Sequence, residues 1–311
     1  MINKKDLSKI GIGTWGMGGF ATKNPNNDDG GQIKALKTAI QRGLNYIETN
    51  MWAAEGHGAW ILSEAIKGSG VSRDDLFIVF VGYPYNVGTI FELESLLDKF
   101  LKLLNSDYVD SFQSSMSTYS KFGEDKTNGF VKKILQSGKA RFTSFTNGNL
   151  ETIEKYKKVF EDRLIAHEVC FNFEIRLNED MGITDFAKKW GILNVVYQPL
   201  RRNRTALQNW PLLVNLAKKY NKAQNQIILN WIIRKGFLPL VKTDNLDHLE
   251  ENLKSLEFEI DQKDFSDIDS FRIGSDLPKI DWSRSGNGKI DGDGIYVDQL
   301  PNIIDELIST I

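Results

Sequence analysis

The most constraining feature of this chain is a regular alternation of short apolar runs with helical patterns over most of its length. The apolar runs have the length and composition of strands that are buried on both faces, as in a parallel sheet. Eight such runs occur, at Ile10–Trp15, Leu44–Glu48, Leu76–Val81, Tyr108–Ser114, Arg141–Thr146, Ile165–Phe171, Leu193–Tyr197 and Phe237–Lys242. Eight strand–helix units in one chain predict an α/β fold of the (β/α)₈ TIM-barrel type.

Glycine residues support the same alternation. Gly43, Gly138, Gly191 and Gly236 each stand between a helical pattern and the next apolar run, where helices often end on a glycine. The alternative is a doubly wound open sheet, which would place a glycine-rich turn directly between its first strand and a helix. The glycines of residues 11–19 are followed by an Asn- and Asp-rich loop sequence instead, so the dinucleotide-binding fingerprint fails on its context.

The whole chain is expected to serve one barrel. No linker-like break interrupts the 311 residues, so 1–311 is predicted to be a single domain with 273–311 as a C-terminal loop and tail. The tail has a Gly- and Asp-rich stretch from Pro278 and then an apolar periodic segment, Ile303–Ile311, which together predict an extra C-terminal loop and helix. Asn287–Asp298 has a faint likeness to a calcium loop, but Lys289 stands where an oxygen ligand is needed, so a solvated loop is predicted.

Composition and charge exclude several classes of function. A net charge of −2 gives no general attraction to nucleic acid or to an anionic membrane surface. The N-terminus has no apolar signal region, and no run approaches membrane-spanning length, so a soluble, cytoplasmic protein is expected. The single cysteine, Cys170, lies in an apolar run and is predicted to be a buried, unreactive thiol. No His/Cys cluster suggests a metal site.

The second strand–helix unit carries polar residues where parallel barrels place their active sites. Glu48 ends the second apolar run, and active sites of such barrels lie at the C-terminal ends of the strands. Glu48 is therefore a candidate catalytic residue, and Tyr83, which follows the third run, is a second one. His57 begins the helix of the same unit and is expected to have a structural role.

Several segments, in order, resemble the aldo-keto reductase superfamily. These segments are GIGTWGMGG, ALKTAIQRGLNYIET, GKARFTSFTN, HEVCFNFEIR, GILNVVYQPL and QIILNWIIRKGFLPLVKTDNLDHLEENLKSLEFEI. The resemblance runs from about Ile10 to Ile260. It implies the same eight-stranded barrel, NADP(H) bound at the C-terminal ends of the strands, and hydride transfer to a small carbonyl substrate.

The resemblance implies a nearly complete set of cofactor-binding residues. The matching positions are Lys242, Thr243 and His248 for the adenosine 2′-phosphate, Glu251 and Asn252 for the adenine, Tyr197 for stacking on the nicotinamide, and Thr146, Asn147 and Glu168 for the carboxamide. Glu168 replaces the usual Gln and so lacks an N–H donor. Lys242 and Thr243 also suit a phosphate on chemical grounds, because they precede a predicted helix. Arg201, Arg202 and Arg204 would add positive charge near the pyrophosphate, or else lie in a solvated loop.

The catalytic positions depart from the family pattern. In the family a Tyr donates the proton, a Lys and a His assist it, and an Asp pairs with the Lys. The matching residues here are Ala53 for the Tyr, Val81 for the Lys, Ser115 for the His and Glu48 for the Asp. Because general acid catalysis contributes ~10²–10⁴ in rate, the ordinary mechanism is not expected to operate. Ser115 remains a candidate catalytic residue only because it occupies the position that matches the family's His.

Glu48 is the group that could replace the missing acid. Without a lysine at position 81 its carboxyl group loses a counter-charge, so its pKa is expected to rise. Alternatively, Glu48 hydrogen-bonds with Ser115 or a tyrosine and takes no part in chemistry. Three functions remain open: an atypical NADP(H)-dependent oxidoreductase of an unknown small carbonyl or alcohol, a catalytically inactive NADP(H)-binding barrel that serves as a redox sensor or partner subunit, and a lyase or isomerase that uses Glu48. The first is favoured, and the sequence identifies no protein partner.

Overall fold

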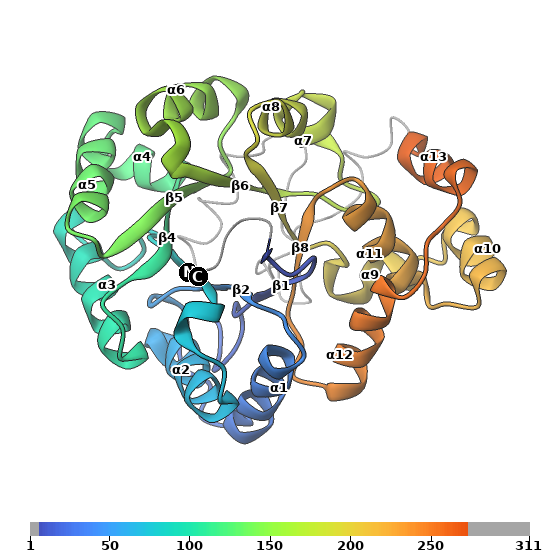
Figure 1. Ribbon diagram of the computed structural model, residues 1–311, viewed down its shortest axis with the longest axis horizontal. Coiled ribbons are helices and arrows are strands. Elements are labelled where there is room, and N and C mark those ends of the chain that lie inside the picture. The colour runs from blue at the N-terminus through green and yellow to red at the C-terminus, as the bar shows by residue number, and fades with distance from the viewer. Residues whose placement is uncertain (1–5, 273–311) are drawn as a thin grey trace.

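The strands form a closed parallel barrel (Figure 1). The structure is a computed structural model that describes residues 6–272. The strands pair in sequential order and β8 pairs back onto β1. They are β1 (Gly11–Gly13), β2 (Tyr46–Thr49), β3 (Phe77–Val81), β4 (Val109–Ser115), β5 (Ala140–Thr146), β6 (Leu164–Cys170), β7 (Leu193–Tyr197) and β8 (Leu238–Val241). All eight predicted strands are confirmed to within two residues, and the doubly wound alternative is wrong because an open sheet would leave β1 and β8 apart.

Helices surround the barrel on its outer side (Figure 1). They are α1 (Asp29–Gln41), α2 (His57–Ser69), α3 (Ile90–Leu104), α4 (Met116–Phe122), α5 (Glu124–Gln136), α6 (Leu150–Phe160), α7 (Leu177–Asp180), α8 (Ile183–Lys189), α9 (Arg204–Leu207), α10 (Pro211–Tyr220), α11 (Gln224–Arg234), α12 (Leu246–Leu253) and α13 (Gln262–Ser270). The four glycines predicted to follow helices all have positive φ, as expected of helix ends. The predicted C-terminal loop and helix, including Asn287–Asp298 and Ile303–Ile311, lie outside the described residues.

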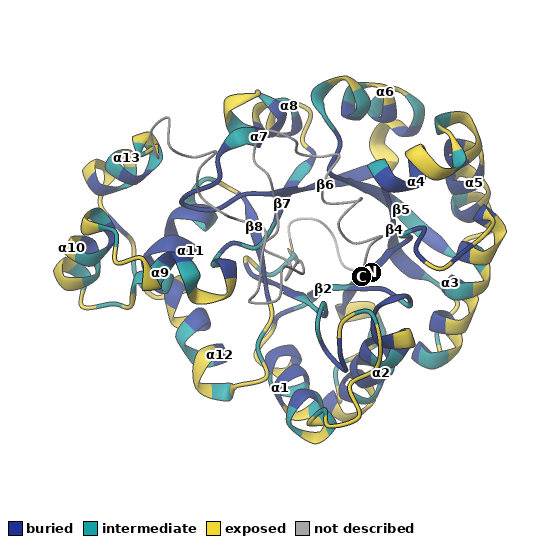
Figure 2. Ribbon diagram, turned by 180° about the vertical axis from the view of Figure 1, so that it is seen from behind, coloured by how far each residue is buried: buried dark blue, intermediate teal, exposed yellow. Residues whose placement is uncertain are grey.

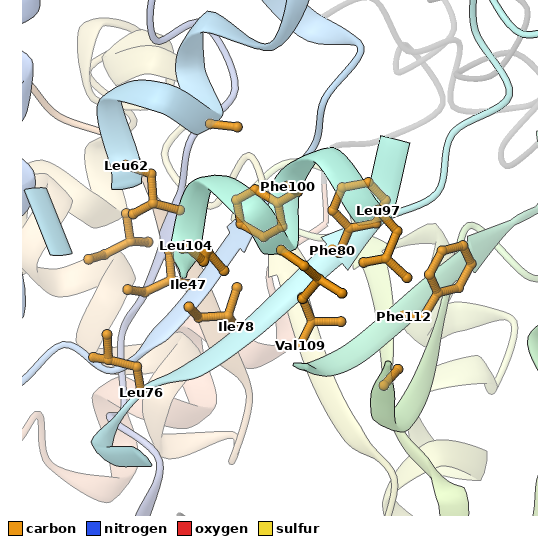
Figure 3. Packing of buried hydrophobic residues seen from close by; sticks show 14 of the residues in the cluster. Ile47, Leu62, Leu76, Ile78, Phe80, Leu97, Phe100, Leu104, Val109 and Phe112 are labelled. Atoms are coloured by element: carbon orange, nitrogen blue, oxygen red, sulfur yellow. The ribbon is translucent and has the colours of Figure 1, made fainter. Parts of the chain in front are cut away.

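The largest apolar cluster fills the space between the strands and the helices. Figure 3 shows Phe80 and Phe112 from neighbouring strands beneath Leu97 and Phe100 of α3. The ring centroids of Phe80 and Phe100 are 5.5 Å apart. In Figure 2 the strands and the inward helix faces are buried, whereas the outer helix faces are exposed. This layer fixes each strand, and therefore the residues at its end.

A second cluster fills the inside of the barrel. Alternate residues of a strand point to the same face, so Tyr46 of β2, Val195 of β7 and their neighbours meet in the interior. The full cluster of buried residues is Tyr46, Phe77, Val79, Ile165, Ala166, Val195, Leu238 and Leu240. Glu48 follows Tyr46 by two positions, and Glu168 follows Ala166 by two. Both carboxyl groups therefore continue the interior face, one layer closer to the C-terminal ends.

Two further sequence predictions concern burial. Cys170 lies at the end of β6 and has no exposed surface, so its predicted burial is confirmed. Among the described residues, no helix has both the length and the apolar character needed to cross a membrane.

Candidate functional site

A cavity of about 760 Å³ opens at the C-terminal ends of the strands. Two of the three predicted catalytic residues, Glu48 and Tyr83, line it. The predicted cofactor residues that line it are Glu168, Tyr197, Lys242, Thr243, His248, Glu251 and Asn252. The closed barrel thus gathers residues from β2, β6, β7 and α12 around one space large enough for a small-molecule ligand.

The side of the cavity near β8 and α12 combines a cation, a hydroxyl group and a helix N-terminus. Lys242 follows β8 directly, and its Nζ lies 3.0 Å from the Asp244 carboxylate. Thr243 accepts a 3.0 Å hydrogen bond from the Asn245 backbone N–H through its hydroxyl oxygen. Asn245 in turn caps α12 by accepting from the Asp247 N–H at 2.8 Å. This arrangement suits an anionic group, because positive charge and helix N–H dipoles converge there.

The arginines after β7 have different roles. Arg201 is buried and forms an ion pair with Glu174, which also accepts bonds from the Thr205 hydroxyl at 2.9 Å and the Trp210 indole at 2.8 Å. Arg202 is exposed, lines the cavity and lies 5.2 Å from the centroid of the Phe20 ring. Arg204 begins α9 and is not among the lining residues. Arg202 is therefore the arginine best placed to meet a ligand.

Next to the barrel axis, Asn147 and Tyr197 hold each other in place. The Tyr197 hydroxyl donates a 2.9 Å hydrogen bond to Asn147 Oδ1, and the Asn147 N–H donates to the Glu168 carbonyl at 3.0 Å. Asn147 Nδ2 is buried with no hydrogen-bond partner in the described part of the chain. A buried donor without an acceptor is costly. Of the predicted cofactor residues, Thr146 and Asn147 are not among those that line the cavity. Thr146 is buried beside Glu168 in the β5–β6 register.

Glu48 and Glu168 form an acid pair across the interior of the barrel. Their strands, β2 and β6, lie on opposite sides of the ring, yet the two carboxyl groups hydrogen-bond to each other. Gln113 of β4 joins them: its Nε2 donates to Glu168 and lies 3.5 Å from Glu48 Oε2. Its Oε1 accepts from the Ser144 hydroxyl at 3.0 Å. The alternative in which Glu48 bonds to Ser115 or a tyrosine is therefore wrong, because its partners come from the facing strands.

The acid pair retains protons that exposed carboxyl groups would lose. Burial raises the pKa of Glu48 well above its usual range, and the nearby Glu168 carboxylate raises it further. Burial also raises the pKa of Glu168, although its hydrogen bonds with Glu48 and Gln113 oppose that rise. The predicted increase for Glu48 is confirmed, with a cause that the sequence did not reveal. Two carboxyl groups this close cannot both ionise at low cost, so one of them holds its proton to a higher pH than an isolated carboxyl group does.

We expect Glu168→Gln to weaken the pH dependence of stability. Both pKa values are higher in the folded than in the unfolded state, so the folded chain binds more protons. Stability therefore falls as the pH rises above the unfolded-state pKa of ~4.3, by up to ~1.4 kcal/mol per pH unit for each proton. The variant removes one titrating group and one repulsion, so its melting temperature should exceed that of the wild type most at pH 8 and least at pH 5.

The matched control is Glu151→Gln, which changes an exposed carboxylate of α6 paired with Lys155. Calorimetric melting temperatures from pH 5 to pH 8 for the three proteins measure the effect. Parallel curves for the wild type and Glu168→Gln would contradict the proton sharing.

The remaining catalytic positions hold side chains that cannot replace the family groups. Ala53 and Val81 are buried. Ser115 is also buried and caps α4, where its Oγ accepts from the Thr118 N–H at 3.2 Å and lies 2.7 Å from Ser117 Oγ. Because the cavity lining does not include it, Ser115 has a structural position.

Aromatic rings occupy the region around Ala53. The Trp52 ring lies 4.8 Å from both Trp15 and Tyr85 and 6.0 Å from Tyr83, centroid to centroid. Trp15 and Tyr83 also line the cavity. An aromatic cluster thus surrounds Ala53, and two of its rings face the cavity that Glu48 also lines.

His57 has the structural role expected of it. Its Nε2 lies 2.9 Å from the Asp29 carboxylate, and its ring stacks on Trp60 at 5.0 Å. It does not line the cavity. Among residues 6–272, no group of three or more His, Cys, Asp or Glu residues is arranged to hold a metal ion.

Sequence reasoning did not identify all lining residues. The unpredicted polar ones are Asn50, Gln198, Asn203, Gln224 and Asn225, and the unpredicted aromatic ones are Trp15 and Phe20. The Gln198 and Gln224 side-chain oxygens have no partner among the described residues. Gln198 directly follows β7, so a strand-end rule would have found it. Gln224 and Asn225 begin α11, and only the closed barrel brings them to the cavity.

Comparison with known proteins agrees with this geometry. Residues 9–273 match the model of the aldo/keto reductase family. The chain is 27% identical over 270 residues to the glyoxal reductase of Bacillus subtilis, covering 86% of this chain and 92% of that protein. It is 24% identical over 268 residues to the methylglyoxal reductase YeaE of Escherichia coli, covering 85% and 90%.

Solved structures give the same result. A thermostable aldo-keto reductase in complex with epalrestat superposes with a TM-score of 0.75 at 28% identity, covering 85% of this chain and 95% of that one. An aldo/keto reductase from Klebsiella pneumoniae in complex with NADP and acetate superposes with a TM-score of 0.73 at 22% identity, covering 85% and 90%. The family match spans most of the chain. The chain belongs to the aldo/keto reductase family of oxidoreductases.

Proposed function

We propose that this protein is an NADP(H)-dependent oxidoreductase that reduces the polar double bond of a small molecule, with Glu48 as the proton donor. The observation that carries the proposal is the shared cavity. Lys242 and Thr243 line it together with the Glu48–Glu168 acid pair, so cofactor-binding groups and a proton source face the same space.

The residues fit a nicotinamide dinucleotide phosphate. Lys242, Thr243 and His248 would hold the 2′-phosphate, and Asn252 would contact the adenine. The unsatisfied Nδ2 of Asn147 would donate to the carboxamide oxygen, next to the ring of Tyr197. With the proton on Glu48, the Glu168 carboxylate would accept a hydrogen bond from the carboxamide N–H. The cofactor would supply the hydride.

Glu48 supplies what the missing tyrosine supplies in the family pattern. A carboxyl group whose pKa is raised holds its proton to a higher pH than an exposed one and can act as a general acid. Burial and the neighbouring Glu168 carboxylate both raise the pKa of Glu48, whereas the hydrogen bond that Gln113 donates to it opposes that rise. The Trp15 and Tyr83 rings line the same cavity. In the carbonyl reaction typical of the family, Glu48 would protonate the oxygen as the carbon is reduced.

Titration with NADPH tests the proposal directly. Trp15 lines the cavity, so NADPH binding is expected to quench tryptophan fluorescence with a Kd in the micromolar range or below, and NADPH should be consumed with a member of a carbonyl and imine panel. Absence of NADPH binding at millimolar concentration would reject both the oxidoreductase and the inactive cofactor-binding barrel. Binding without any turnover would favour the inactive barrel. Turnover of a substrate without cofactor would favour a lyase or isomerase.

A further inference from the structure

Within residues 6–272 no cationic side chain pairs with the acid pair. In the described part of the chain neither Glu48 nor Glu168 forms an ion pair, and the groups they contact are each other and neutral side chains such as Gln113. Two carboxyl groups that share one proton carry one negative charge. Buried charge is normally paired, so this unpaired charge at the floor of a cavity favours a cationic ligand.

The walls beside the pair suit a cation as well. Trp15, Phe20, Tyr83 and Tyr197 line the cavity. The face of an aromatic ring attracts a cation, most strongly where water is excluded. The cationic lining residues have other contacts: Lys242 pairs with Asp244, and Arg202 lies over Phe20. The cavity lining therefore combines the two carboxyl groups with aromatic rings that a cation could contact.

This environment disfavours a carbonyl oxygen as the reacting group. Carbonyl reduction builds negative charge on oxygen, and enzymes stabilise it with cations or oriented donors. The remaining negative charge of the acid pair would oppose the build-up of negative charge on the carbonyl oxygen. An imine nitrogen behaves in the opposite way, because it accepts a proton readily and then carries positive charge next to the pair.

We propose that the acid pair selects a substrate whose reacting group is a carbon–nitrogen double bond, so that an imine is reduced to an amine. This inference rests on the proposed function and narrows its substrate class. The imine carbon accepts a hydride from the reduced nicotinamide cofactor, and the electrons of the C=N π bond move to nitrogen. The nitrogen takes the proton of Glu48, and water returns a proton to the pair. The products are the amine and the oxidised cofactor.

A binding experiment without cofactor tests the charge preference. Cyclohexylamine, which is protonated at pH 7, and cyclohexanol have nearly the same shape and differ in charge. Calorimetry with the wild-type chain is expected to give a Kd at least tenfold lower for the amine. Equal affinity, or tighter binding of the alcohol, would overturn the proposal.

Variants assign the preference to the pair. Glu48→Gln/Glu168→Gln is expected to bind both ligands within threefold of each other, whereas Glu151→Gln should keep the wild-type preference for the amine. If the double variant does not fold, Glu168→Gln alone takes its place in the experiment. Its preference for cyclohexylamine over cyclohexanol should be at least threefold smaller than that of the wild type. An amine preference that survives both variants would place the cation elsewhere and overturn the proposal.

A kinetic comparison separates this inference from the proposed function. With NADPH, the five-membered cyclic imine 1-pyrroline is expected to have a kcat/KM at least tenfold above that of cyclopentanone. Reduction of cyclopentanone with equal or greater kcat/KM would overturn the imine assignment and leave the oxidoreductase proposal standing. Binding of cyclohexylamine without turnover of the imine would also overturn it. Lack of NADPH binding would reject the proposed function itself.

Discussion

Glu48→Gln is expected to lower kcat by ~10²–10⁴ with any substrate that the chain reduces with NADPH. An amide at position 48 can donate a hydrogen bond but cannot release a proton, so the reduced product is no longer protonated as it forms. The Kd for NADPH should stay within threefold of the wild-type value, because the phosphate-holding residues are elsewhere in the cavity. Stopped-flow single-turnover rates and fluorescence titration measure the two quantities separately.

The pH dependence of kcat tests more strictly whether Glu48 donates the proton. Burial and the Glu168 carboxylate raise the pKa of Glu48, so the wild-type kcat should be highest at low pH and fall as Glu48 loses its proton. Glu48→Gln should show no such fall, whereas Glu151→Gln should keep the wild-type rate and profile. A kcat for Glu48→Gln within threefold of wild type would remove Glu48 from proton transfer.

Lys242→Ala is expected to raise the Kd for NADPH by ~10–100-fold, since a hydrogen bond to a charged group contributes ~1.5–3 kcal/mol. The substitution also releases Asp244, whose carboxylate lies 3.0 Å from Lys242 Nζ and would then repel the phosphate. The Kd for NADH, which has no 2′-phosphate, should change by less than threefold. Fluorescence titration with both cofactors therefore separates loss of the phosphate site from general damage.

Lys263→Ala is the control for this variant, because Lys263 is exposed on α13 and pairs with Asp267. It should bind both cofactors as the wild type does. Equal weakening of NADPH and NADH by Lys242→Ala would show that Lys242 supports the cavity without reading the 2′-phosphate.

The strands could be predicted because each is buried on both faces. Apolar runs such as Phe77–Val81 carry that information locally, without reference to the rest of the chain. The loops after the strands were less predictable. The residues from Ala54 to Gly56 all have positive φ in the connection after β2. No local sequence pattern predicts this backbone conformation.

Most residues that the motifs assign to the cofactor do line the cavity, whereas no motif indicates the acid pair. Glu48 and Glu168 stand far apart in the sequence and on opposite strands of the ring, so only barrel closure brings them into contact. From the sequence, Glu48 is assigned to catalysis and Glu168 to the carboxamide of the cofactor, without a link between the two. Gln113, which connects them, lies on β4 and has no local sequence signal that relates it to either glutamate. The spacing of residues along the sequence does not predict which side chains meet across the interior of a barrel.

The tight packing around Ala53 limits which side chains that position can accept. A tyrosine there would have to displace the neighbouring Trp52 and Tyr85 rings, and a lysine at position 81 would replace a buried valine. Each change alone would therefore cost stability. Engineering a tyrosine or a lysine into this part of the barrel requires smaller neighbours to be introduced at the same time.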